Sequence, residues 1–595
     1  MKPSLTLSSC LFGICTSLLF THTAAAAKRN PQAADHPNVI LLITDDQGYG
    51  DLTAHGNPVL RTPHMDRLHI ESARFTDFHV APMCSPTRGQ LMTGIDAMRN
   101  GCTAVCQGRS MMRRELPTMA DFFARSGYAT GHFGKWHLGD SHPHRPQDRG
   151  FHETLHHRAW GITSLADHWG NTYFDPVLDH NGVDKKYEGY CTDIYFNEAM
   201  DWIGRQRAAG KPFFCYLPTN TPHAPDMVVE SDAAPYTKIG KYDGKQVHAA
   251  FYGQIANIDD NLGRLEQFLK KNNLRDDTIL IFMTDNGTRS TQAMKLYNAG
   301  MRGKKTQVYE GGHRVPCFVR WPAGDLQHGA DIGELTQVQD LLPTLIELCG
   351  LDAPDARFDG VSLAGLLLGT QQKLADRKLV VQYRISGAKW DPAAVMWGTW
   401  RLVGPNELYD LKTDPAQTTN IAATRPKIAK AMAEHYERWH AEARPLFDKP
   451  RYIILGSEKA NPMMLYAQDW VGGYCDNGGN LFAANTLGYW DVIVEQDGEY
   501  EFELRRWAPE ANLPLIAGVS STNKRFDGRG ARPIAKARLK IGGVERSADT
   551  APDDTFVRFT ATLKAGTTRL ETLFMNKDGR PLCSAIYVKV TRRAD

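Results

Sequence analysis

The chain of 595 residues has almost no excess of charge of either sign. It carries 69 lysines and arginines against 67 aspartates and glutamates, a formal net charge of +2 at pH 7. Proteins that bind nucleic acids or anionic membranes by long-range electrostatics usually have a clear positive excess. The composition therefore predicts no nucleic-acid partner, and any affinity for anions must come from a local arrangement of side chains.

The sequence also lacks a continuous apolar run of the length that crosses a bilayer, about 20 residues. One shorter run lies in residues 1–27, where it follows Lys2 and ends in an alanine stretch. That pattern is typical of a secretory signal peptide with an A-x-A cleavage site. We expect no membrane span, and export of the mature chain to the periplasm or the medium.

Cysteine is scarce, with 11 residues in the whole chain. Cys10 and Cys15 lie in the predicted signal peptide, and Cys84 belongs to a motif described below. In an oxidising compartment some of the other cysteines can pair, although the sequence does not fix which. Cys102 and Cys106 lack a second cysteine or histidine pair at a suitable spacing, so we expect no zinc site there.

The length and the changes in composition predict several domains, since a domain has roughly 150 residues. We expect a catalytic domain in 28–370, a smaller C-terminal subdomain with an antiparallel sheet in 371–450, and an accessory β-sandwich in 451–595. In the last of these, residues 489–507 form two alternating segments around a QDG turn, a pattern typical of β-strands. The accessory domain can bind carbohydrate or pack against the catalytic domain, and packing is the preferred interpretation.

Two continuous apolar runs, 38–44 and 278–284, end in acidic and amide residues. Apolar runs without alternation are typical of buried parallel strands, whose carboxyl ends hold ligands in open α/β sheets. The residues that follow the two runs are Asp45, Asp46, Asp285 and Asn286. Because buried carboxylates need a compensating cation or donors, these oxygen ligands predict a hard ion such as Ca²⁺ rather than zinc. An Asx turn after the first run is the alternative.

The stretch 80–94, VAPMCSPTRGQLMTG, places a cysteine where a helix is expected to begin. Pro86 suits the first turn of a helix, so Cys84 would lie at its N-terminus, where negative charge is stabilised. Taken alone, this position predicts a cysteine thiolate of low pKa acting as a nucleophile. A buried structural cysteine is the alternative.

The spacing of this stretch resembles the signature of type I sulfatases, in the alkaline-phosphatase-like superfamily. The matching positions are Cys84, Pro86, Arg88, Thr93 and Gly94. The cysteine of that signature is oxidised to formylglycine before folding. The resemblance therefore implies that Cys84 is modified by a formylglycine-generating or sulfatase-maturing enzyme.

Two further features are similar to the same family. Its N-terminal strand also ends in two aspartates, and residues 134–139, GKWHLG, match a family block almost letter for letter. An extended conformation of this block would direct Lys135 and His137 to the same side of the chain. A lysine and a neutral histidine on one face suit sulfate binding and proton transfer.

Two later blocks carry the remaining matches. An apolar run in 211–217 is followed by His223, which occupies the place of a family histidine beside proline. The block around Glu310 is similar to the family's Lys-x₄-Glu-Gly-Gly-x-Arg-Val-Pro, which places Lys305 at the sulfate-binding lysine, with Lys304 as the alternative. Glu310 and the glycines after it are interpreted as a tight structural turn.

The resemblance covers about residues 38–445. It implies an α/β fold in which helices sandwich a large mixed sheet, followed by a smaller α+β subdomain. It also implies a sulfuric ester hydrolase that removes sulfate from a sulfated oligosaccharide or polysaccharide, with one Ca²⁺ ion and a formylglycine. A phosphatase or phosphonate hydrolase of the same superfamily is one alternative, and a glycan-binding protein without catalysis is the other.

The resemblance assigns roles to individual residues. The implied metal ligands are Asp45, Asp46, Cys84, Asp285 and Asn286. The implied catalytic residues are Cys84, Arg88, Lys135, His137, His223 and Lys305. Among them His223 protonates the leaving alcohol and His137 helps to release sulfate afterwards. Lys135, Lys305 and His223 would also contact the substrate.

The segment 141–190 is rich in histidine, arginine and aromatic residues and shows little helical periodicity. A long irregular stretch in a compact enzyme is usually a functional loop or a variable insertion. Trp160, Trp169 and Tyr173 are candidates for stacking on sugar rings, and Trp160 is named here as a substrate-binding residue. Ordinary packing is the alternative for each of them.

Overall fold

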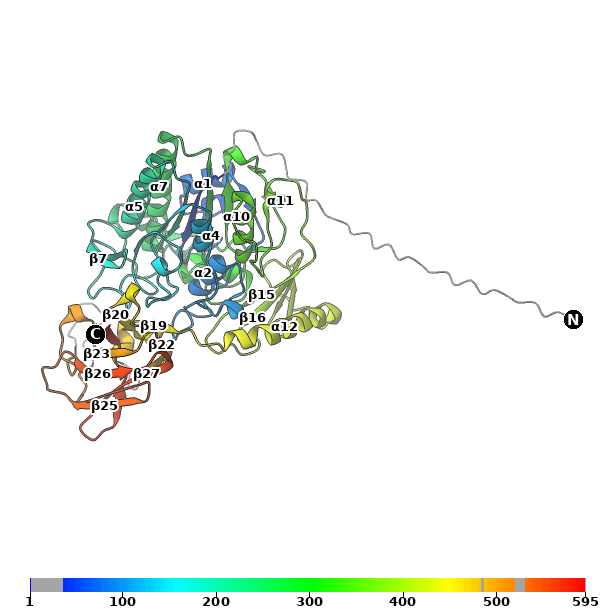
Figure 1. Cartoon of the computed structure of the whole chain (residues 1–595). Coiled ribbons are helices and arrows are strands. Elements are labelled where there is room, and N and C mark those ends of the chain that lie inside the picture. The colour runs from blue at the N-terminus through cyan, green and yellow to red at the C-terminus, as the bar shows by residue number, and fades with distance from the viewer. Residues whose placement is uncertain (2–35, 483–485, 519–529, 594–595) are drawn as a thin grey trace.

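The computed structural model describes Met1 and residues 36–482, 486–518 and 530–593. The predicted signal peptide, apart from Met1, lies outside these residues. Figure 1 shows a large α/β region, a small subdomain that ends in the long helix α12 (Pro426–Phe447), and a β-rich region at the C-terminus. No helix in the described part of the chain combines the length and the low polarity that a membrane crossing requires.

A mixed sheet of ten strands forms the centre of the large region, in the order β13-β2-β12-β11-β1-β8-β4-β5-β6-β7. Its strands are β1 (Asn38–Thr44), β2 (Ala73–Phe75), β4 (Ala129–Phe133), β5 (Glu153–His156), β6 (Val177–His180), β7 (Val183–Lys186), β8 (Phe213–Pro218), β11 (Thr278–Thr284), β12 (Cys317–Arg320) and β13 (Asp331–Ile332). Strands β11, β1, β8 and β4 run parallel at its centre. Every residue of β1 and β11 is buried, so the two apolar runs form neighbouring parallel strands, as predicted.

Two apolar cores cover the two faces of this sheet. Val39, Leu41 and Ile43 of β1 belong to one core, and Ile40 and Leu42 to the other. The first core is closed by α2 (Cys84–Thr93), α4 (Met119–Arg125), α10 (Leu341–Cys349) and α11 (Ala364–Leu367), and the second by α1 (Pro63–Glu71), α5 (Cys191–Ala208) and α7 (Ala249–Lys271), as Figure 1 shows. The predicted sheet between helices is confirmed.

The segment 141–190 is more regular than predicted. It contributes β5, β6 and β7, which extend the main sheet at one edge. Each of these strands has four residues, too few to give a clear alternation, and β7 is fully exposed. The expectation of an irregular segment was therefore wrong for these three strands, and it holds for residues 141–152 and for the turns between β5 and β6.

The small subdomain contains the predicted antiparallel sheet, in the order β15-β16-β17-β18. Its strands are β15 (Lys378–Gln382), β16 (Ala393–Trp397), β17 (Trp400–Val403) and β18 (Glu407–Asp410). Helix α12 covers one face, where Met432, Tyr436 and Ala443 pack against Val395 and Leu402.

The C-terminal region consists of two sheets that share one core, as predicted for a β-sandwich. One sheet contains β19 (Ile453–Leu455), β21 (Val471–Gly472), β22 (Gly488–Val494), β24 (Lys536–Ile541), β25 (Val544–Asp549), β27 (Gly566–Met575) and β28 (Pro581–Cys583). The other contains β20 (Met463–Tyr466), β23 (Gly498–Arg505), β26 (Val557–Leu563) and β29 (Tyr587–Arg592). Strands β22 and β23 flank the QDG turn but lie in different sheets, so the turn connects the two layers.

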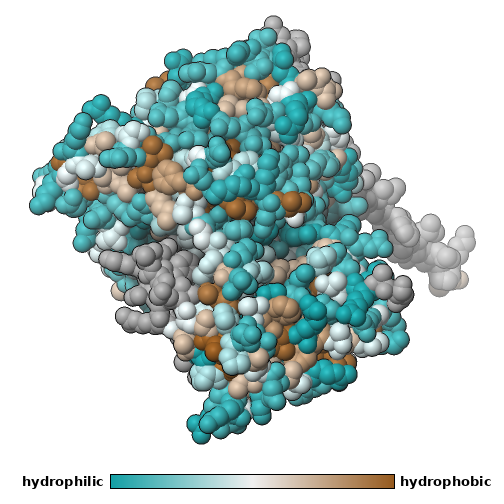
Figure 2. All heavy atoms as spheres, turned by 90° about the vertical axis from the view of Figure 1, so that its left-hand side faces the viewer, coloured by the Kyte–Doolittle hydropathy of each residue, from teal (hydrophilic) through white to brown (hydrophobic). Residues whose placement is uncertain are grey.

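Shorter elements complete the fold. They are β3 (Phe78–His79), α3 (Ala97–Asn100), α6 (Glu230–Ile239), β9 (Lys241–Tyr242), β10 (Lys245–Gln246), α8 (Thr291–Leu296), α9 (Glu310–His313), β14 (Thr336–Gln337) and α13 (Gly478–Phe482). The nine cysteines of the described residues are all buried. The face of the molecule in Figure 2 is mainly hydrophilic, with hydrophobic residues in small scattered groups.

Candidate active site

The acidic residues meet at the carboxyl ends of two adjacent strands. Thr44 of β1 is paired with Thr284 of β11, so Asp45 and Asp285 follow at the same level of the sheet. Asp46 has a φ angle of 69°, a left-handed conformation that aspartate adopts more readily than most residues. Its N–H donates to Asp285 Oδ1 at 3.0 Å. The turn after β1 thus locks the three buried carboxylates into one cluster.

Two oxygens of this cluster, Asp45 Oδ1 and Asn286 Oδ1, are buried without a hydrogen-bond partner. The Asn286 amide is held by its Nδ2, which donates to Asp46 Oδ1 at 2.8 Å. Ligand atoms of Asp45, Cys84 and Asp285 lie within 4.8 Å of one another. Burial, and then the charge of Asp45, raise the pKa of Asp285 to about 7, and a cation would relieve that repulsion. The residues present therefore fit a hard divalent cation.

Cys84 is the first residue of α2, and Pro86 lies in its first turn, as predicted. The cysteine is buried beside the acidic cluster. Burial raises the pKa of its thiol, and the positive charges of Lys135 and Lys305 offset this only in part. The interpretation as a thiolate of low pKa is therefore not supported, because the thiol keeps its proton at neutral pH.

Arg88 and Lys135 bring positive charge to the carboxylates. Arg88 Nη2 donates to Asp285 Oδ2 at 2.8 Å, and its Nη1 donates to the Lys135 carbonyl oxygen at 3.0 Å. Lys135 Nζ lies 2.5 Å from Asp45 Oδ2. Both cations are fully buried, so these ion pairs are shielded from water and strongly oriented.

The turn before Lys135 depends on a glycine. Gly134 has a φ angle of 129°, and a Cβ atom at this position would lie 1.8 Å from the Pro218 carbonyl oxygen. Without a side chain there, the Lys135 N–H approaches and donates to that oxygen at 2.8 Å. The end of β4 is thereby fastened to the end of β8, and Lys135 is directed to the acidic cluster.

His137 corrects the sequence prediction of an extended block. Its φ angle is 58°, and residues 134–139 form a bent, irregular segment and not a strand. His137 Nε2–H donates to the Val105 carbonyl oxygen at 3.0 Å, and Nδ1 is buried without a partner. Burial, and then Lys135, lower the pKa of His137 well below the usual value. The side chain is therefore a neutral imidazole with one free acceptor nitrogen.

Lys305 pairs with Asp46, whereas Lys135 pairs with Asp45. Lys305 Nζ is 2.6 Å from Asp46 Oδ1. Lys304 contacts Gln307 through its main-chain N–H, at 3.1 Å from Oε1. Of the two candidate lysines, the geometry places Lys305 in the site. Three cations, Arg88, Lys135 and Lys305, thus face three carboxylates.

His223 lies at the edge of the cluster and is the most exposed of its histidines. Its Nδ1–H donates to the Ala224 carbonyl oxygen at 2.7 Å, which leaves Nε2 directed to the site, 3.6 Å from Asp46 Oδ2. Burial lowers the pKa of His223, Asp46 raises it, and Lys305 and Lys135 lower it further. An anion bound between the two lysines would offset their effect and favour the protonated ring.

Trp160 is the aromatic residue of the segment 141–190 that contacts the site. Its ring centroid is 5.2 Å from that of His223. Its Nε1–H donates to the main-chain oxygen of Asp476, which belongs to the C-terminal β-sandwich, at 2.9 Å. The indole is only 6% exposed, so it offers a substrate an edge and not an open face.

The other aromatic candidates serve packing. Trp169 contacts Trp507 of the sandwich with ring centroids 5.8 Å apart. Tyr173 is buried, and its hydroxyl donates to the His223 carbonyl oxygen at 3.1 Å. Tyr173 therefore supports the main chain of His223 and offers no exposed ring face for stacking on a sugar, while Trp169 is half-buried against the sandwich.

Sequence reasoning missed a buried ionic network around α9. The Glu310 carboxylate accepts from Arg401 Nε at 2.7 Å, and Arg401 Nη2 donates to Asp77 Oδ1 at 2.9 Å. His79 and His313 share a hydrogen bond between their Nδ1 atoms at 2.9 Å. The network joins the turn at Glu310 to β17 of the subdomain. No motif marks it, because its members come from three separate segments.

Two protein-family models match the chain. One is the sulfatase family, over residues 37–351, and the other is the C-terminal family of N-sulphoglucosamine sulphohydrolase, over residues 302–442. The residues of the site described above all lie within these matches, apart from Asp476.

The chain is also similar to known proteins. It is 32% identical over 380 residues to the N-acetylgalactosamine-6-sulfatase of Sus scrofa, covering 58% of this chain and 68% of the relative. It is 27% identical over 504 residues to the N-acetylgalactosamine-6-O-sulfatase of Bacteroides thetaiotaomicron, covering 69% of this chain and 94% of the relative. A crystal structure of Ps i-CgsB in complex with k-i-k-neocarrahexaose superposes with a TM-score of 0.63 at 26% identity, covering 69% of this chain and 94% of that chain.

Proposed function

The chain belongs to the sulfatase family, within the alkaline-phosphatase-like superfamily, and from this we propose that it removes sulfate from a sulfated carbohydrate with a formylglycine made from Cys84 and one Ca²⁺ ion. The chain is a sulfuric ester hydrolase, which excludes the glycan-binding alternative without catalysis and the phosphatase alternative as its main activity. The names of its relatives support a saccharide substrate, since two are sulfatases of N-acetylgalactosamine and one was crystallised with an oligosaccharide.

The observation that carries the proposal is the position of Cys84. It lies at a helix N-terminus, beside carboxylates whose free oxygens fit a cation, and within the field of Lys135 and Lys305. A thiol with a raised pKa is a poor nucleophile there, so the site calls for a different group at this position. Formylglycine, in its hydrated form, supplies one hydroxyl that takes sulfate from the ester and a second that expels it, which a thiol does not offer.

The oxygen ligands for Ca²⁺ would be Asp45, Asp46, Asp285 and Asn286, together with the modified side chain at position 84. The ion would supply positive charge to the oxygens of the sulfate group. Since three cations already balance three carboxylates, a divalent ion leaves an excess of two positive charges, and a singly charged sulfate ester offsets part of it. Metal binding and substrate binding should therefore support each other.

The remaining residues act on the substrate and on protons. Lys135 and Lys305 bind the sulfate oxygens, and Arg88 holds Asp285 in place. When the bond between sulfur and the ester oxygen breaks, His223 Nε2 gives a proton to that oxygen, and the sugar leaves as an alcohol. In the second half of the reaction, the free Nδ1 of His137 accepts the proton whose removal allows sulfate to leave.

The proposal includes a maturation step and export. A formylglycine-generating or sulfatase-maturing enzyme would modify Cys84 before folding, because the cysteine is fully buried in the folded chain. The residues 1–27 would direct the protein to the periplasm or the medium.

Desulfation of a panel of sulfated oligosaccharides, with product masses as the readout, tests this function. We expect loss of sulfate from at least one saccharide and release of an unmodified sugar hydroxyl. The oligosaccharide of the panel that loses sulfate identifies the class of substrate. An enzyme with full formylglycine content that releases phosphate from phosphate esters, but no sulfate from any ester, would contradict the proposal.

A further inference from the structure

The β-sandwich forms hydrogen bonds to two loops, and each of these loops contacts one of the two catalytic histidines. Asp476 O accepts from Leu165 N–H at 3.1 Å as well as from the Trp160 indole, and Tyr587 Oη donates to Leu165 O at 2.7 Å. These contacts hold the loop that places Trp160 beside His223. The sandwich is therefore in contact with one wall of the active site.

A second group of contacts reaches the loop that supports His137. Gln107 Nε2 donates to Gly472 O at 2.5 Å, and Asp140 N–H donates to Asp469 Oδ2 at 3.1 Å. Val105, two residues before Gln107, accepts the hydrogen bond of His137 Nε2. The sandwich segment 469–476 thus spans the distance between the surroundings of the two histidines.

Tyr474 lies in the middle of this segment, and its side chain is 45% exposed. The position of the ring is fixed by a hydrogen bond of 2.5 Å from its hydroxyl to Asp476 Oδ2. Asp476 is itself 3% exposed, and its other carboxylate oxygen accepts from Asn477 Nδ2 at 2.9 Å. An exposed aromatic ring on a buried, fully hydrogen-bonded carboxylate is a rigid surface at low cost in conformational entropy.

Hydrogen bonds connect the ring to the surroundings of the reaction centre. The Tyr474 hydroxyl donates to Asp476, and the main-chain oxygen of Asp476 accepts from the Trp160 indole, whose ring centroid is 5.2 Å from that of His223. A single residue, Asp476, therefore links Tyr474 to the wall of the site that contains His223.

We propose that Tyr474 of the β-sandwich is a specificity-determining residue that stacks against the sugar whose sulfate is removed. The inference rests on the proposed function. With the sulfate between Lys135 and Lys305, the ester oxygen faces His223, and the sugar extends from there toward Trp160 and Tyr474. The apolar C–H face of a sugar ring packs on an aromatic face, while the buried edge of Trp160 limits its depth. The sandwich is thus part of the substrate site.

Kinetics of the full-length, formylglycine-containing enzyme test the inference. In Tyr474→Ala we expect KM for the reactive saccharide to rise about 10-fold, the usual effect of removing an aromatic anchor. Inhibition of aryl-sulfate turnover by inorganic sulfate should stay within about 2-fold, because sulfate contacts the lysines and not Tyr474. In Tyr474→Phe, which keeps the ring and loses the hydrogen bond to Asp476, the rise in KM should be smaller than in Tyr474→Ala.

Tyr242→Ala is the matched control, since Tyr242 is 43% exposed on the β9–β10 hairpin of the catalytic region. Equal KM values in Tyr474→Ala and Tyr242→Ala would overturn the inference, as would an equal loss of inorganic-sulfate inhibition and saccharide affinity. Either result leaves the proposed function intact. If the unaltered enzyme releases no sulfate from any ester, the proposed function itself is wrong. If it hydrolyses aryl sulfates but no saccharide, the saccharide assignment and this inference fail together.

Discussion

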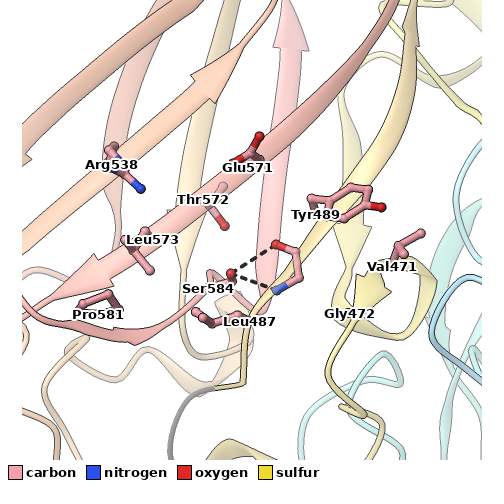
Figure 3. A pocket seen from close by; sticks show the side chains of 11 residues that line it. Val471, Gly472, Leu487, Tyr489, Arg538, Glu571, Thr572, Leu573, Pro581 and Ser584 are labelled. Atoms are coloured by element: carbon pink, nitrogen blue, oxygen red, sulfur yellow. Dashed lines mark hydrogen bonds between the residues drawn. The ribbon is translucent and has the colours of Figure 1, made fainter.

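The catalytic site and the pocket of the β-sandwich both collect polar side chains, but only one of them leaves polar atoms unpaired. The sandwich pocket has a volume of about 430 Å³ and is lined by residues of β21, β22, β24, β27 and β28. On its floor, Ser584 Oγ donates to Gly488 O at 3.1 Å and accepts from Gly488 N–H at 3.2 Å, as the dashed lines in Figure 3 show. Thr572 Oγ1 accepts from Ala585 N–H at 3.0 Å.

In the catalytic site, by contrast, Asp45 Oδ1, Asn286 Oδ1 and His137 Nδ1 are buried without partners. A buried polar atom left unpaired costs about 1–3 kcal/mol, so three of them in one site need an explanation. The proposed cation and the proposed proton transfer supply that explanation for the catalytic site, whereas the polar atoms on the floor of the sandwich pocket are already paired within the protein.

Of all the changes considered, removal of Cys84 is expected to have the largest effect on turnover. Cys84→Ala cannot be converted to formylglycine, so turnover of every sulfate ester should fall by about 10⁴-fold or more, as for other lost nucleophiles. In the active enzyme, the peptide with position 84 should weigh about 18 Da less than its cysteine form, the change expected for thiol-to-aldehyde oxidation. A fully active enzyme with an unmodified Cys84 would show that the catalytic group is different.

Removal of the metal should have the second-largest effect on turnover. A bound cation contributes several kcal/mol of charge stabilisation, so chelation should lower turnover by about 10³-fold, and Ca²⁺ should restore it. The companion variant is Asn286→Ala, which keeps the carboxylates but loses one unpaired oxygen and the hydrogen bond to Asp46, and it should need a higher Ca²⁺ concentration for the same activity. Restoration by Zn²⁺ or Mn²⁺ far beyond that by Ca²⁺ would contradict the assignment of this site to Ca²⁺.

Variants of the two histidines separate two steps of the reaction within the catalytic site. His223→Ala should slow sugar sulfates by about 10²–10⁴-fold, the usual loss for a general acid, because a sugar alkoxide needs a proton to leave. Aryl sulfates should lose much less, since a nitrophenolate is stable without one. Rates for both substrate types give the answer, and equal losses would mean that His223 is not the acid.

His137→Ala provides the contrast to His223→Ala. If its Nδ1 acts after the ester oxygen has left, both substrate types should turn over slowly in the steady state. A burst of nitrophenolate in the first turnover should remain, with sulfate retained on the protein. Absence of both the burst and the retained sulfate would assign His137 a structural role at Val105.

Local patterns in the sequence were sufficient for much of the fold and site. The continuous apolar runs of β1 and β11 predicted parallel strands. The register of these two strands explains why Asp45 and Asp285 lie close together. The start of α2 at Cys84 followed from Pro86, whose fixed φ angle suits a first turn. Such features are local in sequence, so one chain is enough to find them.

Other features depend on contacts between distant segments. The left-handed conformation of His137 follows from the packing of its turn against Val105 and Ser85, and an alternation argument cannot anticipate it. The burial that raises the pKa of Cys84 is likewise a property of the fold. Tyr474 and Asp476 reach the site from a region beyond the sulfatase resemblance, and no sequence motif marks them.

The sandwich pocket should give the smallest effect. Tyr489 lies at its rim, with the Arg569 guanidinium 4.4 Å above its ring, a contact of about 0.5–1 kcal/mol at an exposed site. Because the polar atoms on the pocket floor are already paired, Tyr489→Ala should leave KM for the reactive saccharide within about 2-fold of the parent. Its thermal stability should fall slightly, from the loss of the ring contact. Saccharide kinetics and a thermal melt measure the two quantities. A rise in KM of the size expected for Tyr474→Ala, with no change in the inhibition by inorganic sulfate, would show that this pocket binds carbohydrate, and would make satisfied hydrogen bonds a poor criterion for a structural role.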